Sequence, residues 1–198
     1  MPLDKEPTKY TDICIDLETW SLRPTAAIRS IGAVAFNIEG EADTPFQYAS
    51  FYQNTRDTIG HRDVKTEEWW SQQSKEAQDA FLKNVYGLHI GLFNLMDFIG
   101  VWSDPSTVRV WSNGAGFDIP IIRNACSNCY DRMEQYVAPV WSYKNERDTR
   151  TLYWMAGGRI STAMAGVKHN ALDDAVHEAI SLRTSWLVIR NRMPGSST

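Results

Sequence analysis

The sequence has few of the features that place a protein in a membrane or in an oxidising compartment. Its 198 residues include three cysteines, an odd number that does not fit a disulfide framework and that predicts a reducing cytoplasm. No apolar run is long enough to span a bilayer, and no basic segment followed by an apolar one indicates a signal peptide. Cys126 and Cys129 form a single CxxC without the second pair that a zinc site needs. We therefore interpret them as two thiols one turn apart on a helix.

The chain also lacks an excess of positive charge. Its 20 lysine and arginine residues are outnumbered by 24 aspartates and glutamates, which gives a net charge of -4 and a pI near 5.6. This balance argues against a protein that binds nucleic acid through bulk positive charge. It does not exclude one that reaches phosphates through metal ions, because divalent cations reverse the local charge.

The composition that remains fits one globular domain. Hydrophobic residues make up 43% and charged residues 22% of a chain long enough to bury a sizeable core. No repeat, low-complexity tract or linker divides it. We predict a flexible N-terminus over residues 1–9, a single domain over residues 10–191 and a flexible tail over residues 192–198.

Hydrophobic periodicity and turn residues predict strands and helices along the whole chain. Strands are expected at residues 10–18, 30–38, 45–54, 107–112 and 136–141. Helices are expected at residues 67–82, with Thr66 as the cap, and at 88–102, 119–132, 147–158 and 172–190. Short connections between the first three strands indicate an antiparallel meander, after which strands alternate with helices. This order predicts an α/β fold with a central mixed five-stranded sheet flanked by helices.

Two carboxylates interrupt the apolar first strand. In "YTDICIDLETW", Asp16 and Glu18 are two residues apart and therefore project from the same face of a strand. Ile13, Ile15 and Leu17 point the other way, into apolar packing. Two like charges this close raise each other's pKa unless a cation lies between them. Oxygen ligands suit Mg²⁺ or Mn²⁺ rather than zinc, although the pair alone fits a solvated surface as well.

Further acidic residues follow the fourth strand and begin the last helix. Asp118 comes directly after "SNGAGF", where the simplest role is a helix N-cap. In "KHNALDDAVHEA", Asn170 is a good N-cap, which leaves His169 just outside the helix and places Asp174 on its first turns. Asp173 falls at the third helical position, where an acid complements the helix N-terminus. Asp174 is therefore the freer of the two to hold a metal ion.

Together these residues resemble a known family. The motifs D-x-E, N-x-x-x-F-D and H-x-x-x-x-D are similar, in this order, to the three motifs of the DEDDh 3′-5′ exonucleases, which have an RNase H-like fold; they are carried here by Asp16, Glu18, Asn113, Phe117, Asp118, His169 and Asp174. The segments "DLETWSLRPTAAIRSIGAV" and "RVWSNGAGFDIPII" resemble the phage exodeoxyribonuclease A group and the mycobacterial-type exoribonucleases. The resemblance covers about residues 10–190.

The resemblance implies a two-metal active site. Asp16, Glu18, Asp118 and Asp174 would hold two Mg²⁺ or Mn²⁺ ions, which clamp the attacking and leaving oxygens of a phosphodiester. His169 would act as the general base, a role that suits an unperturbed imidazole pKa of about 6.5. The products would be nucleoside 5′-monophosphates, released from the 3′ end of single-stranded nucleic acid.

The resemblance also indicates substrate contacts. Thr19 and Trp20 fall where the family contacts the 3′-terminal sugar and base, and Trp20 either stacks on a base or packs in the core. The other expected contacts are Phe117, Lys168 and Arg150, with a solvated lysine as the alternative for Lys168. Asp148, beside Arg150, is expected to cap a helix. Trp69 and Trp70 are about 100° apart on a helix, so either one is exposed for stacking or one packs in the core and one at its edge.

Two further hypotheses compete with the exonuclease. One is a catalytically silent nucleic-acid-binding module on the same fold, and the other is a purely structural protein, which leaves the five acidic and histidine residues without a reason. The sequence leaves the choice between RNA and DNA open. Because relatives are often homodimers, the resemblance predicts a homodimer, in the cytoplasm of a bacterium or of a phage-infected cell.

Overall fold

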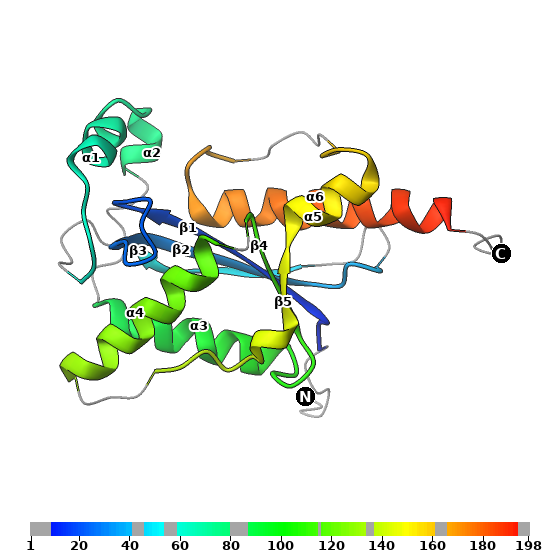
Figure 1. Ribbon diagram of the computed structural model, residues 1–198, viewed down its shortest axis with the longest axis horizontal. Helices are drawn as coiled ribbons and strands as arrows, with labels where there is room; N and C mark the ends of the chain where they lie inside the picture. Colours follow the sequence, from blue (N-terminus) through cyan, green and yellow to red (C-terminus); the bar gives the residue numbers. More distant parts are fainter. Residues whose placement is uncertain are drawn as a thin grey trace, which may run out of the picture.

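Five strands form one mixed sheet at the centre of the protein (Figure 1). The computed structural model describes residues 9–40, 46–53, 59–79, 87–114, 116–133, 137–160 and 166–193. The strands are β1 (Asp12–Thr19), β2 (Ile28–Phe36), β3 (Gln47–Gln53), β4 (Arg109–Ser112) and β5 (Glu146–Asp148), in the order β3-β2-β1-β4-β5. β2 is antiparallel to β1 and β3, whereas β4 is parallel to β1 and β5. The predicted mixed sheet is confirmed.

Helices cover both faces of this sheet. They are α1 (Val64–Ser71), α2 (Lys75–Asp79), α3 (Leu88–Trp102), α4 (Asp118–Met133), α5 (Thr149–Ala156) and α6 (Ala171–Arg192), with a 3-10 turn (Tyr143–Asn145) before β5. In Figure 1, α3 and α4 lie on one side of the sheet and α5 and α6 on the other, while α1 and α2 stand beside the end of β1. Within the described ranges, no helix is both long and apolar enough to cross a membrane.

The alternation of β1 sends its side chains into two different cores. Ile13, Ile15 and Leu17 are buried in the larger hydrophobic cluster, to which α3 and α4 contribute, as predicted. Cys14 points the other way and is buried in a second cluster formed with α5 and α6. The next even-numbered positions of the strand carry the two carboxylates of the D-x-E motif. These carboxylates therefore lie on the α6 side of the sheet, where β1 ends.

The start of α6 lies directly on the sheet beside these carboxylates. Gly32 of β2 is the partner of Asp16 in the antiparallel ladder. A Cβ atom at Gly32 would come within 2.4 Å of the Ala171 carbonyl group and of the Leu172 nitrogen. Any other residue would push away the first turn of α6 and, with it, Asp174. Glycine at this position thus allows the helix to approach the carboxylates of β1.

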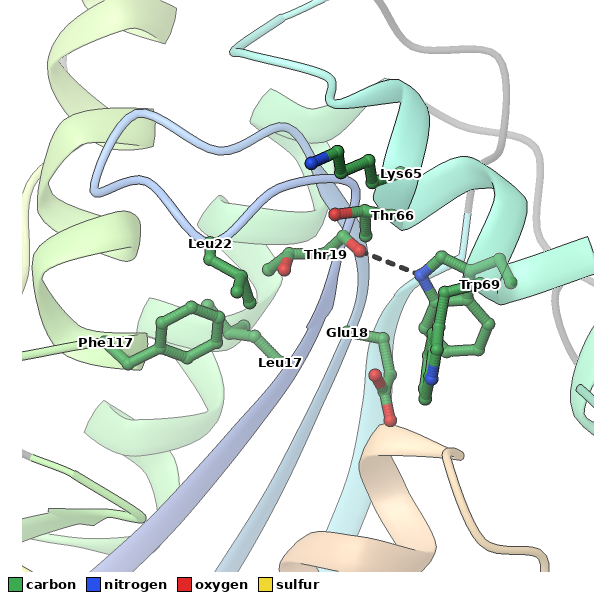
Figure 2. A pocket seen from close by; sticks show the side chains of 9 residues that line it. Leu17, Glu18, Thr19, Leu22, Lys65, Thr66, Trp69 and Phe117 are labelled. Carbon is green, nitrogen blue, oxygen red and sulfur yellow. Dashed lines mark hydrogen bonds between the residues drawn. The ribbon is translucent and has the colours of Figure 1, made fainter.

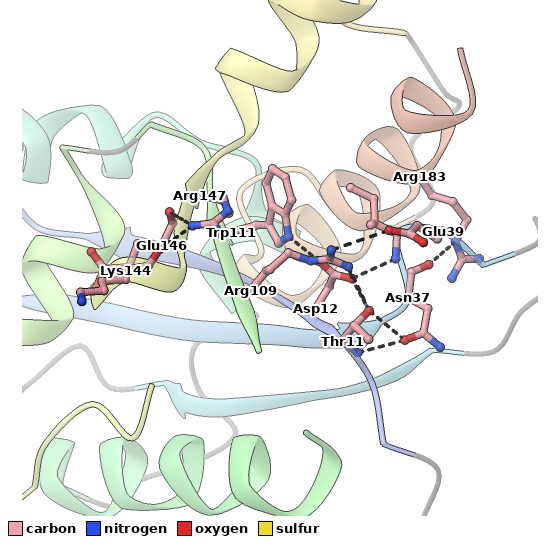
Figure 3. A network of polar contacts seen from close by, with 11 residues as sticks. Thr11, Asp12, Asn37, Glu39, Arg109, Trp111, Lys144, Glu146, Arg147 and Arg183 are labelled. Atoms are coloured by element: carbon pink, nitrogen blue, oxygen red, sulfur yellow. Dashed lines mark hydrogen bonds and ion pairs between the residues drawn. The ribbon is translucent and has the colours of Figure 1, made fainter. Parts of the chain in front are cut away.

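A buried carboxylate holds the start of β1 to its neighbours (Figure 3). Asp12 is 0% exposed and accepts hydrogen bonds from Nε and Nη2 of Arg109, at 2.7 and 2.8 Å. It also accepts from Nε1 of Trp111 at 2.8 Å and from the backbone N–H of Ile38 at 3.1 Å. Arg109 and Trp111 belong to β4, and Ile38 follows β2, so one carboxylate links three strands. A buried charge with this many donors is well compensated, and the network fixes β1 upstream of the D-x-E motif.

The helix predicted over residues 67–82 differs in the structure. Asp63, not Thr66, is its cap, because the Asp63 carboxylate accepts a hydrogen bond from the Lys65 N–H at 2.8 Å. The helix also ends after Ser71, and Ser74 starts a second one by accepting from the Ala77 N–H at 3.2 Å. Local capping by aspartate and serine side chains therefore divides a segment of uniform helical propensity. Residues 80–82 lie outside the described residues.

The fifth strand was predicted at the wrong place. Residues 137–141 are irregular, and Val137 and Trp141 are buried in the core without joining the sheet. Pro139 lacks the N–H that a strand ladder requires. β5 is instead a short charged segment at the edge of the sheet, where Glu146 forms an ion pair with Arg123 of α4. Charged residues are common on edge strands, so apolar patterning alone misses them. Residue 136 lies outside the described ranges.

Other local predictions are confirmed. Asp148 caps α5 and Asn170 caps α6 through their side chains. Cys126 and Cys129 lie one turn apart on α4, and both thiols are buried. Burial, followed by the neighbouring Cys129, raises the pKa of Cys126 to about 12, which disfavours the reactive thiolate at this position. Most of the two predicted flexible ends falls on residues 1–8 and 194–198, which lie outside the described residues.

Candidate active site

The structure brings the five predicted acidic and histidine residues together where β1 ends beside α4 and α6. They come from β1, from the first turns of α4 and α6, and from the loop before α6; they are Asp16, Glu18, Asp118, His169 and Asp174. Carboxylate oxygens of Glu18 and Asp174 and a ring nitrogen of His169 lie within 4.8 Å of one another. Asp118 joins them through β1, because its Oδ1 accepts a hydrogen bond from the Leu17 N–H at 3.3 Å.

Burial and mutual repulsion keep the four carboxyl groups from ionising easily. Desolvation, followed by the charges of Asp118 and Glu18, raises the pKa of Asp16 well above its ordinary value. Desolvation and Asp174 raise the pKa of Glu18 to about 8, and desolvation raises that of Asp118 to about 7. Desolvation also raises the pKa of Asp174. The protein's own cations do not neutralise this cluster, which is the electrostatic signature of a site for external cations.

His169 has an unusual backbone conformation that its neighbours support. Its φ is +65°, in the left-handed region that few residues other than glycine adopt. The His169 N–H donates a hydrogen bond to Asp174 Oδ2 at 3.0 Å, and Nδ1 lies 4.0 Å from Glu18 Oε1. Burial, and then the charge of Lys168, lower the pKa of the imidazole. The ring is therefore neutral at pH 7, as a proton acceptor must be.

Two tryptophans of α1 contact the His169 ring edge to face. The ring centroid of Trp69 lies 4.9 Å from that of His169, and the centroid of Trp70 lies 6.1 Å away. Trp70 is buried, donates from Nε1 to the Thr19 carbonyl at 2.9 Å, and has the guanidinium of Arg29 at 3.8 Å from its ring centroid. Trp69 is 42% exposed. Trp70 is therefore in the core and Trp69 is exposed at its edge, which is compatible with both predicted alternatives.

An apolar cavity of about 440 Å³ opens beside Glu18 (Figure 2). We call it the apolar cavity; it is lined by Leu17, Glu18, Thr19, Leu22, Lys65, Thr66, Trp69, Trp70 and Phe117. In Figure 2, Phe117, Leu17 and Leu22 lie on one side and Trp69 on the other, with Glu18 between them. A flat apolar ring fits between walls of this kind.

A second cavity, of about 340 Å³, adjoins the first at Leu17 and Glu18. We call it the acidic cavity; it is lined by Asp16, Leu17, Glu18, Asn113, Arg159, Lys168, His169, Asp174, His177 and Glu178. It contains three of the four carboxylates and the imidazole of the predicted site. The two cavities together form a surface that is apolar at one end and charged at the other.

Three of the five predicted substrate contacts line one of the two cavities, and the other two do not. Thr19 and Phe117 line the apolar cavity, and Lys168 lines the acidic one. Trp20 is 8% exposed and packs with Trp70, so the structure favours core packing over base stacking for it. Arg150 lines neither of these two cavities, and its Nε donates to Asn113 Oδ1 at 3.2 Å.

Sequence reasoning missed three charged or titratable residues of the acidic cavity, namely Arg159, His177 and Glu178. Glu178 lies four residues after Asp174 in α6, so helical periodicity places it on the same face and was a usable signal. Arg159 follows the two glycines that end α5, and no local pattern points to it. Its place in the cavity depends on tertiary structure.

Comparisons with known proteins agree with this architecture. A family model described as 3′-5′ exoribonuclease Rv2179c-like domain matches residues 11–186. The solved RNase domain of the yeast Pop2 protein is similar with a TM-score of 0.57 and 13% identity, over 96% of this chain and 81% of that one. The Mg²⁺ and Mn²⁺ bound form of S. pombe Pop2p is similar with a TM-score of 0.52 and 12% identity, over 95% of this chain and 86% of that one. Product-bound exonuclease I is similar with a TM-score of 0.52 and 13% identity, over 96% of this chain and 45% of that one.

The solved structures establish the fold of the chain, and the family model establishes its family. No curated protein matches the chain by sequence. The solved structures share the fold, an RNase H-like mixed sheet with helices on both faces, as predicted. The family match spans all three motifs and both cavities. The chain therefore belongs to the Rv2179c-like family of 3′-5′ exoribonuclease domains, which are phosphodiester hydrolases.

Proposed function

We propose that the protein is a metal-dependent exonuclease that removes nucleoside 5′-monophosphates one at a time from the 3′ end of single-stranded RNA. The observation that carries this proposal is the convergence of four carboxylates and one imidazole beside an apolar cavity. Membership in a family of 3′-5′ exoribonucleases supports the polarity and favours RNA over DNA.

The donor set fits two divalent cations. Asp16, Glu18, Asp118 and Asp174 offer the oxygen ligands that Mg²⁺ and Mn²⁺ prefer. Burial is the main cause of their raised pKa values and mutual repulsion adds to it, so cations between them would stabilise the ionised carboxylates. Pop2p of S. pombe, which shares the fold, has been solved with these two metals bound. Two such ions supply an activated water and stabilise the charge that develops on the phosphate.

His169 is proposed to accept the proton of the attacking water. Its lowered pKa leaves the ring neutral, so one ring nitrogen has a lone pair for the proton. The contacts with Trp69 and Trp70 hold the ring, and the hydrogen bond from the His169 backbone N–H to Asp174 holds the backbone, beside the carboxylates. The base is thus positioned before the substrate binds, which reduces the reorganisation that the reaction requires.

The apolar cavity is proposed to receive the 3′-terminal base. Leu22 and Phe117 form one wall and Trp69 the other, and Lys65 and Thr66 provide polar groups. Stacking of a base on an aromatic side chain contributes about 1–3 kcal/mol and tolerates different bases. A base held here places the adjoining phosphate near Glu18, because Glu18 lines both cavities.

The test is cleavage of matched single-stranded RNA and DNA labelled at the 5′ end, with Mg²⁺, with Mn²⁺ and with chelator. We expect a ladder of products shortened stepwise from the 3′ end, release of 5′-monophosphates, and no reaction with chelator. Asp16→Asn removes a proposed metal ligand and should abolish cleavage. Glu68→Gln changes an exposed acid of α1 and serves as the matched control with wild-type activity.

Other outcomes distinguish the competing hypotheses. Metal-dependent binding of single strands without cleavage would favour the silent binding module. Full activity of Asp16→Asn would contradict the proposed mechanism, and faster cleavage of DNA than of RNA would contradict the proposed substrate.

Two properties of the whole protein stay predictions. We propose a cytoplasmic location, which is supported by three buried cysteines that form no disulfide. The homodimer implied by the family resemblance is checked by analytical ultracentrifugation of the full chain.

A further inference from the structure

We propose that Arg159 binds the phosphate next to the scissile one, on its 5′ side, and that Glu178 holds Arg159 in place. This inference rests on the proposed function and adds a substrate contact that lies outside the three motifs. Arg159 follows α5, and Glu178 lies in α6 one turn after Asp174.

Glu178 orients the guanidinium of Arg159. Glu178 is 5% exposed, and its Oε2 accepts a hydrogen bond from Arg159 Nη2 at 2.8 Å. The same Nη2 lies 3.1 Å from Nδ1 of His177, and the guanidinium carbon lies 5.5 Å from the ring centroid of Tyr153. One corner of the guanidinium is therefore held by α5 and α6.

The rest of the guanidinium is available to a ligand. Within the part of the chain that the structure describes, Nε and Nη1 of Arg159 donate to no other residue. Arginine presents its five N–H groups in a rigid fork that matches two oxygens of a phosphate. A half-exposed arginine that lines the acidic cavity, and whose outer edge is bound by none of the described residues, is suited to this contact.

Glu178 is difficult to explain as a purely structural residue. After burial, which is the main cause, its charge is among those that raise the pKa values of Asp16 and Asp118. Its Oε1 is buried, and the pKa of the Tyr153 hydroxyl is raised by burial and then by the charge of Glu178. A glutamate here therefore adds repulsion to an acidic cluster. Its hydrogen bond with Arg159 offers a functional explanation for a glutamate here, because it fixes the guanidinium of Arg159 at the end of the acidic cavity.

The arrangement of the two cavities indicates which phosphate reaches Arg159. The cavities share Leu17 and Glu18, whereas Arg159 and Glu178 line only the acidic one. A strand with its terminal base in the apolar cavity has its scissile phosphate at the carboxylates. The strand then continues across the acidic cavity, so the next phosphate meets Arg159.

The test compares two dinucleotides that differ by one phosphate. A dinucleoside monophosphate with a free 5′-hydroxyl contains only the scissile phosphate, and its 5′-phosphorylated form adds the group proposed to reach Arg159. We expect wild-type kcat/KM to favour the phosphorylated form by about tenfold or more, the effect of one hydrogen bond between charged groups. Arg159→Ala should bring the ratio of the two kcat/KM values close to one, and this ratio, rather than either rate alone, is the readout.

Three more variants sharpen the comparison. Arg159→Lys should keep part of the preference, because the ammonium retains the charge but not the fork. Glu178→Gln should also reduce it, because the guanidinium loses its charged partner while the side chain keeps its shape. Arg190→Ala removes an exposed charge from the far end of α6 and should keep the full preference. In longer strands, a neutral methylphosphonate in place of this phosphate should slow the wild type and not Arg159→Ala.

Equal kcat/KM of the wild type for the two dinucleotides, or equal cleavage of the methylphosphonate strand, would overturn the proposal. An unchanged preference in the Arg159 variants would also overturn it. If Arg159→Ala does not fold, as judged by circular dichroism, Arg159→Lys and Glu178→Gln give the answer. A wild type that cleaves no RNA at all would instead refute the proposed function.

Discussion

Replacing Glu18 with glutamine should stabilise the metal-free protein while it removes activity. The pKa of Glu18 is about 8 in the folded protein, against an ordinary value of 4.5, because burial and then Asp174 disfavour its charged form. The folded protein therefore binds a proton at Glu18 more tightly than the unfolded chain does. By linkage, the free energy of unfolding falls as the pH rises from about 4.5 to about 8. Glutamine does not titrate, so the variant does not lose free energy of unfolding at this position as the pH rises.

The size of the effect follows from the same values. One pKa unit corresponds to about 1.36 kcal/mol, so the difference between 4.5 and about 8 corresponds to about 5 kcal/mol as an upper limit. Glutamine still buries a polar amide, which retains part of the penalty, and we expect a gain of about 2–4 kcal/mol at pH 8. For a chain of this size the gain raises Tm by roughly 5–15 °C.

The assay is thermal and urea unfolding with chelator, at pH 4.5 and at pH 8. The variant should exceed the wild type at pH 8 and match it to within about 0.5 kcal/mol near pH 4.5, where Glu18 is neutral in the folded protein and about half ionised in the unfolded chain. Added Mn²⁺ should stabilise the wild type more than the variant, because binding to the folded state alone adds stability by mass action. Glu68→Gln, on the exposed face of α1, should change stability by less than about 0.5 kcal/mol. A variant no more stable than the wild type at pH 8, or equally more stable at both pH values, would refute the reasoning.

Three other predictions separate chemistry, substrate binding and folding. His169→Asn should lower kcat about 10²–10⁴-fold, as loss of a general base does, with near wild-type Tm, because asparagine tolerates a φ of +65°. Trp69→Ala should raise KM for RNA about fivefold or more by removing a stacking wall, whereas Trp154→Ala, on an 80% exposed side chain of α5, should not. Asp12→Ala should lower the free energy of unfolding by about 3–5 kcal/mol in urea titrations, because it leaves the Arg109 guanidinium without its buried partner.

Local rules in the sequence predicted a large part of the site. The period-two alternation of β1 placed Asp16 and Glu18 on one face, and the capping preference of asparagine fixed where α6 begins. From that boundary, His169 falls outside the helix and Asp174 inside it, as the structure has them. These residues were predictable because each depends on the geometry of one element and not on how elements pack.

The remaining features depend on packing that the sequence does not display. Arg159 enters the acidic cavity because α5 lies beside α6, and its position along the chain gives no signal of this. β5 was missed because an edge strand is stabilised by its neighbour β4 rather than by an apolar pattern. In the sequence Gly32 is one small residue in an apolar strand. Only the structure shows that a Cβ atom at this position would lie 2.4 Å from the backbone at the start of α6.

Two carboxylates on the same face of β1 show how the protein separates stability from function. Asp12 receives two hydrogen bonds from Arg109 and one from Trp111, so its burial is compensated by donors of the chain itself. Asp16 lies four residues further along the strand, and among the described residues no donor reaches it. Burial raises its pKa, and the charges of Asp118 and Glu18 raise it further. The fold thus supplies three side-chain donors from β4 at one buried aspartate and, among the described residues, none at the other. We infer that the missing partners at Asp16 are cations from solution, and that instability of the metal-free cluster is the consequence of keeping their places open.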